Sequence, residues 1–422
     1  MQKLLIRGRR ELSGSISISG SKNATLPILA ATILAKSVTL KNIPLVKDIF
    51  TMLELLEFIG VKTKIQYNKK IIVLNNQKKD INTLAPYRLV KTMRAGVLVL
   101  GPLLTKYKKA KVSLPGGCAI GTRPVDLHLL ALKKLGAQIK IKNGYVIAEA
   151  KKGLTGCKIR FPSISVGATE NALLAAFSAK GTTTLSNCAI EPEVLDLINF
   201  LKKLGSVIKV IGRKIIIAGT GKINEKVNHK VIFDRIEAGT YLVAGALMGK
   251  KFFIKNIVPK ILKIEIETLK KMGAKIKIKK NIIFVSRNKS LKKINISTKP
   301  YPGFPTDLQA QLMVLMTQAK GVSKIQENIF ENRFMHVPEL KRMGAKIQIK
   351  NKTAYIYGPT KLIGAEVMAT DLRASVSLVL AGLISDNRTI LNRIYHLDRG
   401  YESLEAKLKR CKADIKRAKY EI

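Results

Sequence analysis

The residues best suited to chemistry lie in a glycine- and proline-rich stretch from Leu114 to Asp126. Its three glycines and two prolines predict an irregular loop with defined bends. Cys118 lies in this loop five residues before Arg123, and a nearby cation favours the thiolate, the reactive form of cysteine. The pattern indicates a reactive thiol, with an inert loop cysteine as the alternative.

A second candidate is Lys22, which follows Ser19-Gly20-Ser21 and precedes the apolar run from Leu26 to Ala35. An ammonium group beside the free N–H groups of a helix start suits the binding of an anion. The pattern is weak by itself, because many helices begin after Ser or Asn.

A third candidate is Asp307, in the stretch from Tyr301 to Ala310. The bends expected at Pro302, Gly303 and Pro305 place Asp307 in the first turn of a helix. A chemical role and simple compensation of the helix dipole are both open for this carboxylate.

Several arginines stand beside Gly, Asp or Asn in a chain whose positive charge comes mostly from lysine. Guanidinium groups in such places favour planar, two-pronged recognition of anions, with an ordinary solvated charge as the alternative. These residues are Arg94, Arg333, Arg373 and Arg399.

The length of 422 residues suits two domains of roughly 200 residues each. No run reaches the ~18 apolar residues of a membrane span, and the first residues lack the apolar core of a signal peptide. The four cysteines are far apart, which is typical of a reducing cytosol. We therefore expect a soluble, cytoplasmic protein.

The net charge of +48 raises the possibility of a basic nucleic-acid-binding or scaffold protein. However, the lysines are spread along the whole chain, and aromatic residues for base stacking make up only 5% of it. We therefore expect no specific nucleic-acid binding, solvated lysines, and some attraction for anionic substrates.

One pattern recurs six times: a helix ending in Leu-x-x-hydrophobic-Gly, followed by an alternating strand. Successive copies begin about 70 residues apart. They span Leu56–Ile65, Leu132–Ile141, Leu201–Val210, Leu269–Ile278, Leu340–Ile349 and Leu408–Arg417.

The glycines of five copies stand where a helix C-cap needs a positive φ. Lys412 takes that place in the sixth copy, so we expect an altered or frayed cap there. The residues after each cap alternate with period two, as in a strand with one wet face. Six unrelated junctions are the alternative, but the regularity favours an α/β chain of two three-unit domains with mixed or antiparallel strands.

The sequence lacks the motifs of several other kinds of functional site. Gly245 to Lys251 has neither the spacing nor the Ser/Thr of a phosphate-binding P-loop. The four histidines lack paired metal-ligand spacing, and neither a dinucleotide fingerprint nor a nucleophile elbow is present.

Together, eight strings in order resemble the enolpyruvyl transferase family, and within it the enzymes that act on a nucleotide sugar. The resemblance runs from end to end of the chain. The strings are SGSKNATLPILAA, LPGGCAIGTRPVDLHL, SVGATENALLAA, FDRIEAGTY, YPGFPTDLQAQ, FENRFMHVPEL, MATDLRAS and YHLDRGYE.

The resemblance implies an inside-out α/β barrel of two similar domains, each made of three βαβαββ-like units. The first domain would span 22–230 and carry the Cys118 loop, which we expect to act as a lid. The second would combine 1–21 with 231–422, leaving chain crossings near Lys22 and Lys230. The family's active site is the cleft between the domains.

The implied reaction moves the enolpyruvyl group of phosphoenolpyruvate to the 3′-hydroxyl of UDP-N-acetylglucosamine and releases phosphate, the first committed step of peptidoglycan synthesis. By resemblance, Lys22, Arg123 and Arg399 clamp phosphoenolpyruvate and Asn23 lines its site. Cys118 is the proton donor or the nucleophile that forms an adduct, and Asp307 takes the hydroxyl proton. Neither a cofactor nor a metal is expected.

The resemblance also implies a set of contacts to the nucleotide sugar, with Arg333 and Arg373 as further cleft residues. In place of a lysine common among relatives stands Ser163, which puts one uridine-phosphate contact in doubt. The nearest rival is the sister enzyme acting on shikimate 3-phosphate, which lacks the Cys118 loop. The expected nucleotide-sugar contacts are Arg94, Arg123, Pro124, Val125, Asp126, Leu127, Ser165, Val166, Gly167, Asp307 and Ile329.

Overall fold

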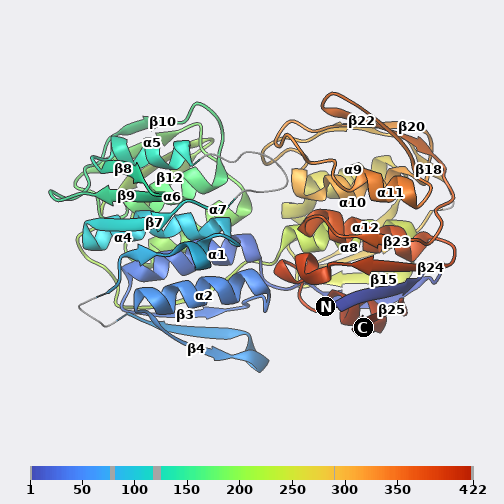
Figure 1. Ribbon diagram of the computed structural model, residues 1–422, viewed down its shortest axis with the longest axis horizontal. Helices are drawn as coiled ribbons and strands as arrows, with labels where there is room; N and C mark the ends of the chain where they lie inside the picture. Colours follow the sequence, from blue (N-terminus) through green and yellow to red (C-terminus); the bar gives the residue numbers. More distant parts are fainter. Residues whose placement is uncertain (1, 77–80, 117–124, 289, 420–422) are drawn as a thin grey trace. The chain divides into compact units, whose positions relative to one another are not determined.

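The computed structural model describes residues 2–76, 81–116, 125–288 and 290–419 (Figure 1). The chain divides into two compact units. The central unit holds the described residues between 20 and 232, and the terminal unit holds those in 2–19 and 233–419. The two units are described separately below.

The central unit contains three four-stranded sheets with one shared pairing pattern. In each, a parallel pair at one edge is followed by two antiparallel pairs. The strand orders are β14 (Lys226–Lys230), β3 (Ser37–Lys41), β5 (Ile71–Asn75), β4 (Lys62–Gln66); β6 (Leu84–Ala85), β7 (Lys109–Ser113), β9 (Tyr145–Glu149), β8 (Gln138–Lys142); and β10 (Lys158–Arg160), β11 (Thr182–Ser186), β13 (Lys214–Ala218), β12 (Val207–Ile211).

The terminal unit repeats the pattern in three more sheets. The strand orders are β2 (Leu12–Ser17), β15 (Gly249–Lys255), β17 (Ile282–Ser286), β16 (Lys275–Lys279); β18 (Leu291–Lys292) with β19 (Asn295–Ser297), β20 (Ala319–Gln326), β22 (Thr353–Gly358), β21 (Lys346–Lys350); and β23 (Glu366–Met368), β24 (Arg388–Asn392), β1 (Gln2–Arg7), β25 (Asp414–Lys419).

Segments far apart in the chain complete several of these sheets. In the terminal unit, Leu4 of β1 pairs with Leu391 of β24, and Ile16 of β2 pairs with Ile254 of β15. In the central unit, Val227 of β14 pairs with Val38 of β3. The mixed pairing confirms the prediction of an α/β chain with mixed or antiparallel strands.

All six predicted helix–strand copies are present, each as an outer helix that leads into an edge strand. The outer helices are α2 (Lys47–Ile59), α5 (Asp126–Lys134), α7 (Pro192–Lys203), α9 (Lys263–Lys271), α11 (Val337–Arg342) and α13 (Leu404–Arg410). The five cap glycines have φ values of 121°, 101°, 115°, 96° and 92°, as the capping argument requires.

The sixth cap was expected to be altered or frayed, and it is altered but not frayed. Lys412 adopts a φ of 71° in place of glycine. Its N–H donates to the Lys409 carbonyl at 3.0 Å, and the next N–H, of Ala413, donates to Leu408 at 3.1 Å. The copy at Gly344 makes the equivalent two bonds, so the lysine backbone accepts the strain and the cap closes.

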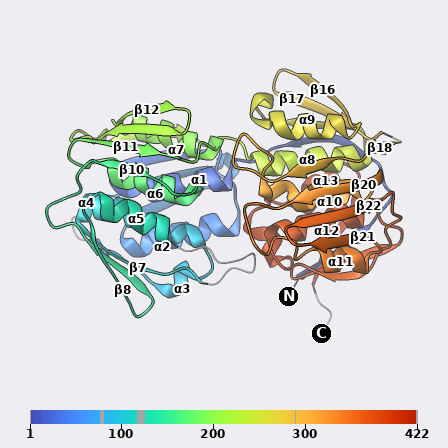
Figure 2. The same cartoon turned by 90° about the horizontal axis from the view of Figure 1, so that it is seen from above.

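Three inner helices in each unit are mostly buried and contribute to its hydrophobic core. Figures 1 and 2 show them between the sheets and outer helices of their own unit. The inner helices are α1 (Lys22–Ala31), α4 (Leu100–Tyr107) and α6 (Val166–Ala176), and α8 (Arg235–Met248), α10 (Gln309–Met316) and α12 (Leu372–Ile384).

Short helical turns connect these elements. They are η1 (Thr32–Leu34), η2 (Tyr67–Lys69), α3 (Tyr87–Val90), η3 (Arg94–Val99), η4 (Pro259–Leu262), η5 (Thr306–Leu308) and η6 (Ile394–Arg399). Within the described ranges, no helix combines the length and the apolar character needed to cross a membrane.

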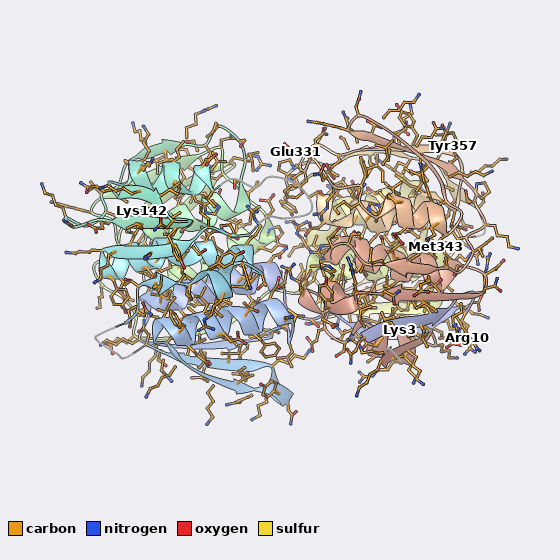
Figure 3. The ribbon with its side chains drawn as sticks, viewed as in Figure 1. Lys3, Arg10, Lys142, Glu331, Met343 and Tyr357 are labelled. Carbon is orange, nitrogen blue, oxygen red and sulfur yellow. The ribbon has the colours of Figure 1, made fainter. Side chains whose placement is uncertain are left out.

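Lysines of the alternating strands are exposed, as expected of solvated charges. Lys275, Lys277 and Lys279 of β16 are all exposed, and β16 pairs along one edge with β17. Figure 3 shows Lys142, at the end of β8, projecting outward in the same way.

Candidate active site

The starts of the inner helices carry several of the predicted site residues. In the terminal unit, α8 is capped by Asp234, whose Oδ1 accepts from the N–H groups of Ile236 and Glu237 at 2.9 Å. The start of α12 is capped by Asp371, whose Oδ1 accepts from Arg373 and Ala374. Asp307 lies in η5, the turn that opens α10, which confirms its predicted place in a first helical turn.

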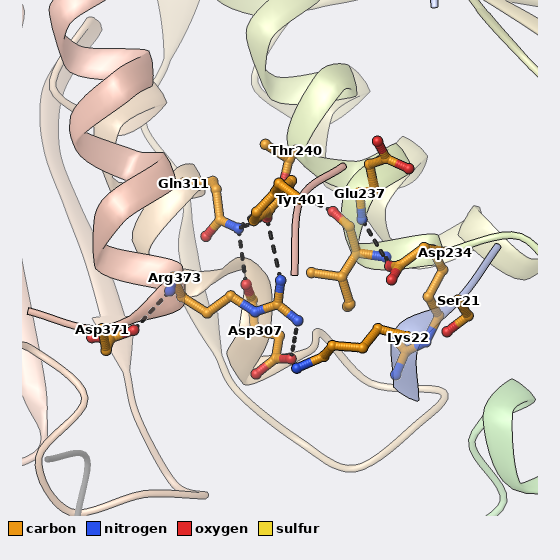
Figure 4. A network of polar contacts seen from close by, with 12 residues as sticks. Ser21, Lys22, Asp234, Glu237, Thr240, Asp307, Gln311, Asp371, Arg373 and Tyr401 are labelled. Atoms are coloured by element: carbon orange, nitrogen blue, oxygen red, sulfur yellow. Dashed lines mark hydrogen bonds and ion pairs between the residues drawn. The ribbon is translucent and has the colours of Figure 1, made fainter. Parts of the chain in front are cut away.

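Asp307 is gripped by two guanidinium groups (Figure 4 shows the second). Arg333 Nη2 donates to Asp307 Oδ1 and Arg373 Nη2 donates to Oδ2, both at 2.7 Å. The two arginine side chains are 4% and 7% exposed, whereas that of Asp307 is 26% exposed. The carboxylate is therefore held by two buried cations, and part of its side chain remains exposed.

Arg373 stays charged in this setting. Burial lowers the pKa of Arg373, but the negative charge of Asp307 and its hydrogen bond outweigh that effect and raise it above its ordinary value. An ion pair between a buried guanidinium and a carboxylate is strengthened by the reduced screening around it.

Glu327 joins Ile329 to the Asp307 segment. The Glu327 side chain is buried and its Oε1 accepts from Thr298 Oγ1 at 2.9 Å and from the N–H of Ile329 at 2.8 Å. Its Oε2 accepts from Thr306 Oγ1 at 2.9 Å, next to Asp307. The Glu327 carboxylate thus fixes Ile329, a predicted nucleotide-sugar contact, relative to Asp307, the predicted general base.

Arg399 ends η6 and is half-buried. The residue before it, Asp398, accepts two hydrogen bonds from Arg417 of β25, at 2.7 and 2.9 Å. Arg417 also donates to Glu405 of α13 at 2.7 and 3.2 Å. This shared guanidinium ties the segment that carries Arg399 to the edge strand β25.

In the central unit, Lys22 is the first residue of α1, whose cap is Ser21. Lys22 Nζ lies 3.1 Å from Asp48 Oδ2, and the two side chains are 12% and 7% exposed. Asn23 follows it and is half-buried. The predicted ammonium group is therefore at a helix start, with part of its charge balanced by Asp48.

Two of the predicted nucleotide-sugar contacts of the central unit, Arg94 and Gly167, lie near His128 of α5. Burial, and to a smaller extent the charge of Arg94 in η3, lowers the pKa of His128 to about 4. A Cβ built on Gly167 would lie 3.0 Å from His128 Cε1, so a side chain at this position would require the ring to shift. The histidine is therefore neutral at physiological pH.

Asn171 of α6 holds these elements together. Its Oδ1 accepts from the N–H of Gly101 at 2.8 Å, and its Nδ2 donates to the Val97 carbonyl at 3.2 Å. The same amide nitrogen lies 3.1 Å from His128 Nδ1, which must accept and therefore carries no proton. The start of α4, the turn η3 and the helices α5 and α6 are fixed around one buried amide.

The remaining predicted contacts have different exposures. Val125 is buried, Leu127 and Ser165 are half-buried, and Asp126 and Val166 are exposed. Ser163, in place of the expected lysine, is exposed. Cys118, Arg123 and Pro124 lie outside the described residues. In the described part of the chain, no group of three or more His, Cys, Asp or Glu side chains could hold a metal ion.

Sequence reasoning missed several residues of this site: Asp48, Asn171, Thr240, Gln311, Glu327 and Tyr401. Gln311 could have been found, because it follows Asp307 by four residues and so shares its helix face. The others depend on contacts between distant segments, which no local pattern reports.

Fold and site together define an enolpyruvyl transferase. Residues 6–408 match the family of EPSP synthase (3-phosphoshikimate 1-carboxyvinyltransferase), and the chain belongs to this family. Its fold is similar to that of the enolpyruvyl transferase NikO from Streptomyces tendae, with a TM-score of 0.89, 26% identity, and coverage of 99% of this chain and 98% of that one. EPSP synthase from Acinetobacter baumannii shares the fold, with a TM-score of 0.76, 19% identity and coverage of 99% and 100%.

Curated relatives are more similar in sequence. The chain is 58% identical to UDP-N-acetylglucosamine 1-carboxyvinyltransferase of Pelagibacter ubique (strain HTCC1062), over 99% of this chain and 100% of the relative. The proteins of the same name from Rickettsia akari (strain Hartford) and Rickettsia canadensis (strain McKiel) are each 51% identical, over 99% of this chain and 100% of theirs.

Proposed function

We propose that this chain transfers the enolpyruvyl group of phosphoenolpyruvate to the 3′-hydroxyl of UDP-N-acetylglucosamine and releases phosphate, the first committed step of peptidoglycan synthesis. We also propose that it works in the cytoplasm, on these two small molecules, and that residues of both units act in one reaction. Relatives at 51–58% identity over 99% of the chain support this choice within the family.

The geometry that carries the proposal is the carboxylate of Asp307, held at both oxygens by buried arginines yet partly exposed. A general base must be fixed in position and must reach the proton that it removes. Asp307 meets both needs, because Arg333 and Arg373 restrict its rotation while 26% of its side chain stays exposed.

The reaction proceeds by addition and elimination. Asp307 takes the 3′-hydroxyl proton, the sugar oxygen bonds to C2 of phosphoenolpyruvate, and the methylene carbon gains a proton. In the second step that carbon loses a proton, the C2–O bond to phosphate breaks and the double bond returns. We assign to Cys118, on family resemblance, the role of proton donor or of the nucleophile of a covalent adduct.

Positive charge is required in both steps, because phosphoenolpyruvate is highly anionic and the leaving phosphate gains additional negative charge. We assign this task to Lys22, Arg123 and Arg399. The half-buried state of Lys22 and the anchored segment of Arg399 support it, since fixed cations need little rearrangement as charge develops.

The deciding experiment measures phosphate release from phosphoenolpyruvate with UDP-N-acetylglucosamine, and separately with shikimate 3-phosphate, the substrate of the sister enzyme. We expect release with the nucleotide sugar alone. Phosphate release with shikimate 3-phosphate would contradict the proposal. A lack of release with both acceptors would contradict it as well.

The role of Asp307 is tested by Asp307→Asn, which we expect to lower kcat by about 10²–10⁴-fold, the usual contribution of a general base. Asp386→Asn is the matched control, because Asp386 also pairs with two cations, Arg9 at 2.6 Å and Lys361 at 2.8 Å, but both are at the surface. Equal activity in the two variants would remove Asp307 from the mechanism.

A further inference from the structure

Tyr401 is buried in the terminal unit, two residues after Arg399, and its hydroxyl lies at the centre of a polar network (Figure 4). The phenol oxygen is 2.8 Å from Thr240 Oγ1, 3.3 Å from Arg373 Nη1 and 3.4 Å from Gln311 Nε2. Three inner helices, α8, α10 and α12, therefore meet at this one hydroxyl.

The hydrogen-bond inventory fixes the direction of these contacts. Thr240 Oγ1 donates its proton to the Ile236 carbonyl at 2.8 Å, so it must accept the proton of the Tyr401 hydroxyl. Burial raises the pKa of Tyr401 despite the opposing charge of Arg373, so the phenol keeps that proton. The phenol oxygen is then an acceptor for Arg373 Nη1–H.

This arrangement holds the Arg373 guanidinium at two of its corners. Nη1 donates to Tyr401 and Nη2 donates to Asp307 Oδ2 at 2.7 Å. Gln311 strengthens the same frame, because its amide nitrogen donates to the Asp307 carbonyl at 3.0 Å and to Thr240 at 3.1 Å. Because the guanidinium is planar and donates through both Nη1 and Nη2, the Arg373 side chain cannot rotate without breaking one of these hydrogen bonds.

We propose that Tyr401 is a positioning residue: its hydroxyl orients Arg373 so that Asp307 is held ready to remove the proton of the sugar hydroxyl. The inference rests on the proposed function and extends it to a buried residue that has no assigned contact with either substrate. Because Tyr401 lies two residues from Arg399, the same side chain also links the expected base to the segment that carries an expected phosphoenolpyruvate clamp.

A matched control is available in the same core. Tyr241, next to Thr240 on α8, is 1% exposed, and its hydroxyl has no hydrogen-bond partner among the described residues. Tyr241→Phe therefore removes the same atom from the same kind of surroundings without breaking a hydrogen bond. Replacing an unpartnered buried hydroxyl is nearly neutral or stabilising.

The first experiment compares kcat and KM in Tyr401→Phe and Tyr241→Phe. We expect Tyr401→Phe to lower kcat by about 10–100-fold, the effect of losing a hydrogen bond to a charged group, with KM for both substrates changed by less than about threefold. Tyr241→Phe should match the wild type. Equal kcat in the two variants would overturn the inference.

A double-mutant cycle distinguishes positioning from general weakening of the core. In an Arg373→Lys background, Tyr401→Phe should change kcat by less than about twofold, because its route through the guanidinium has been removed. If the two substitutions lower kcat independently, so that the loss in the double variant is the product of the two single losses, the proposal is overturned.

A crystal structure of Tyr401→Phe tests the positioning without relying on turnover. We expect Arg373 to turn away from Asp307 Oδ2, and a guanidinium that stays in place would contradict the inference. Absence of phosphate release by the wild-type protein would instead count against the proposed function, so the two failures are distinguishable.

Discussion

At the scale of single residues, the protonation of His336 links pH to stability. His336 is 1% exposed and its Nε2 has no hydrogen-bond partner among the described residues. Burial, with the charge of Arg333, lowers its pKa to about 4, although Asp371 and a backbone hydrogen bond oppose this. The folded terminal unit therefore holds His336 neutral.

The sign of the effect follows from linkage. Between the ordinary histidine pKa of about 6.5 and the folded value, the unfolded chain binds a proton that the folded chain does not. The stabilisation is complete above that range and is lost as the pH falls through it, by about 3 kcal/mol at most. We expect His336→Gln to flatten the decline in unfolding free energy from pH 6.5 to 4.5, as measured by denaturant titration. Parallel pH profiles for variant and wild type would contradict this.

At the scale of elements, the helix caps offer a direct test of backbone strain. Lys412 has a φ of 71°, where a side chain costs energy that glycine avoids. Lys412→Gly should raise the free energy of unfolding by about 0.5–1 kcal/mol, measured by thermal or denaturant unfolding. A loss of stability on this change would show that the lysine side chain contributes more than its backbone costs.

Two cap glycines serve as references for that measurement. A Cβ on Gly136 meets nothing within 4 Å, whereas one on Gly205 would lie 2.7 Å from the Lys222 carbonyl oxygen. Gly136→Ala reports the cost of φ alone, and Gly205→Ala adds a backbone collision. We expect both to destabilise, with Gly205→Ala the more severe.

At the scale of the whole molecule, charge repulsion is the dominant feature of the surface. The chain has 76 Lys and Arg against 28 Asp and Glu, a net charge of +48. Such an excess destabilises the compact state, and salt screens it, since the Debye length falls from roughly 30 Å at 0.01 M to 8 Å at 0.15 M. We expect the melting temperature to rise over this range of sodium chloride. A series with sucrose at equal osmolality controls for non-ionic effects, and a melting temperature independent of salt would contradict the prediction.

The six repeated units show how far local pattern extends. Period-two alternation and the cap glycines predicted the helix–strand junctions, because side-chain direction and φ are set by neighbours in sequence. The same reasoning placed Asp307 in a first helical turn. It did not predict that the cap closes at Lys412, where the backbone adopts a conformation that lysine alone disfavours.

Family resemblance proposed Arg333, Arg373 and Asp307 as residues of one site, but their bonds to one another depend on distant contacts. Asp307 is 26 residues from Arg333 and 66 from Arg373 along the chain. Thr240 and Tyr401 are separated by 161 residues, so no periodicity in either segment indicates their hydrogen bond.

The sequence by itself therefore determined the elements, their sixfold repetition and the chemical types available to a site, since these depend on local conformational preference and on residue identity. Only the tertiary structure decided that Asp307 is held by two buried arginines and that Tyr401 supports one of them. The reason is physical: the burial of three inner helices brings their starts together, and the low exposure found there makes each remaining polar atom take a specific partner.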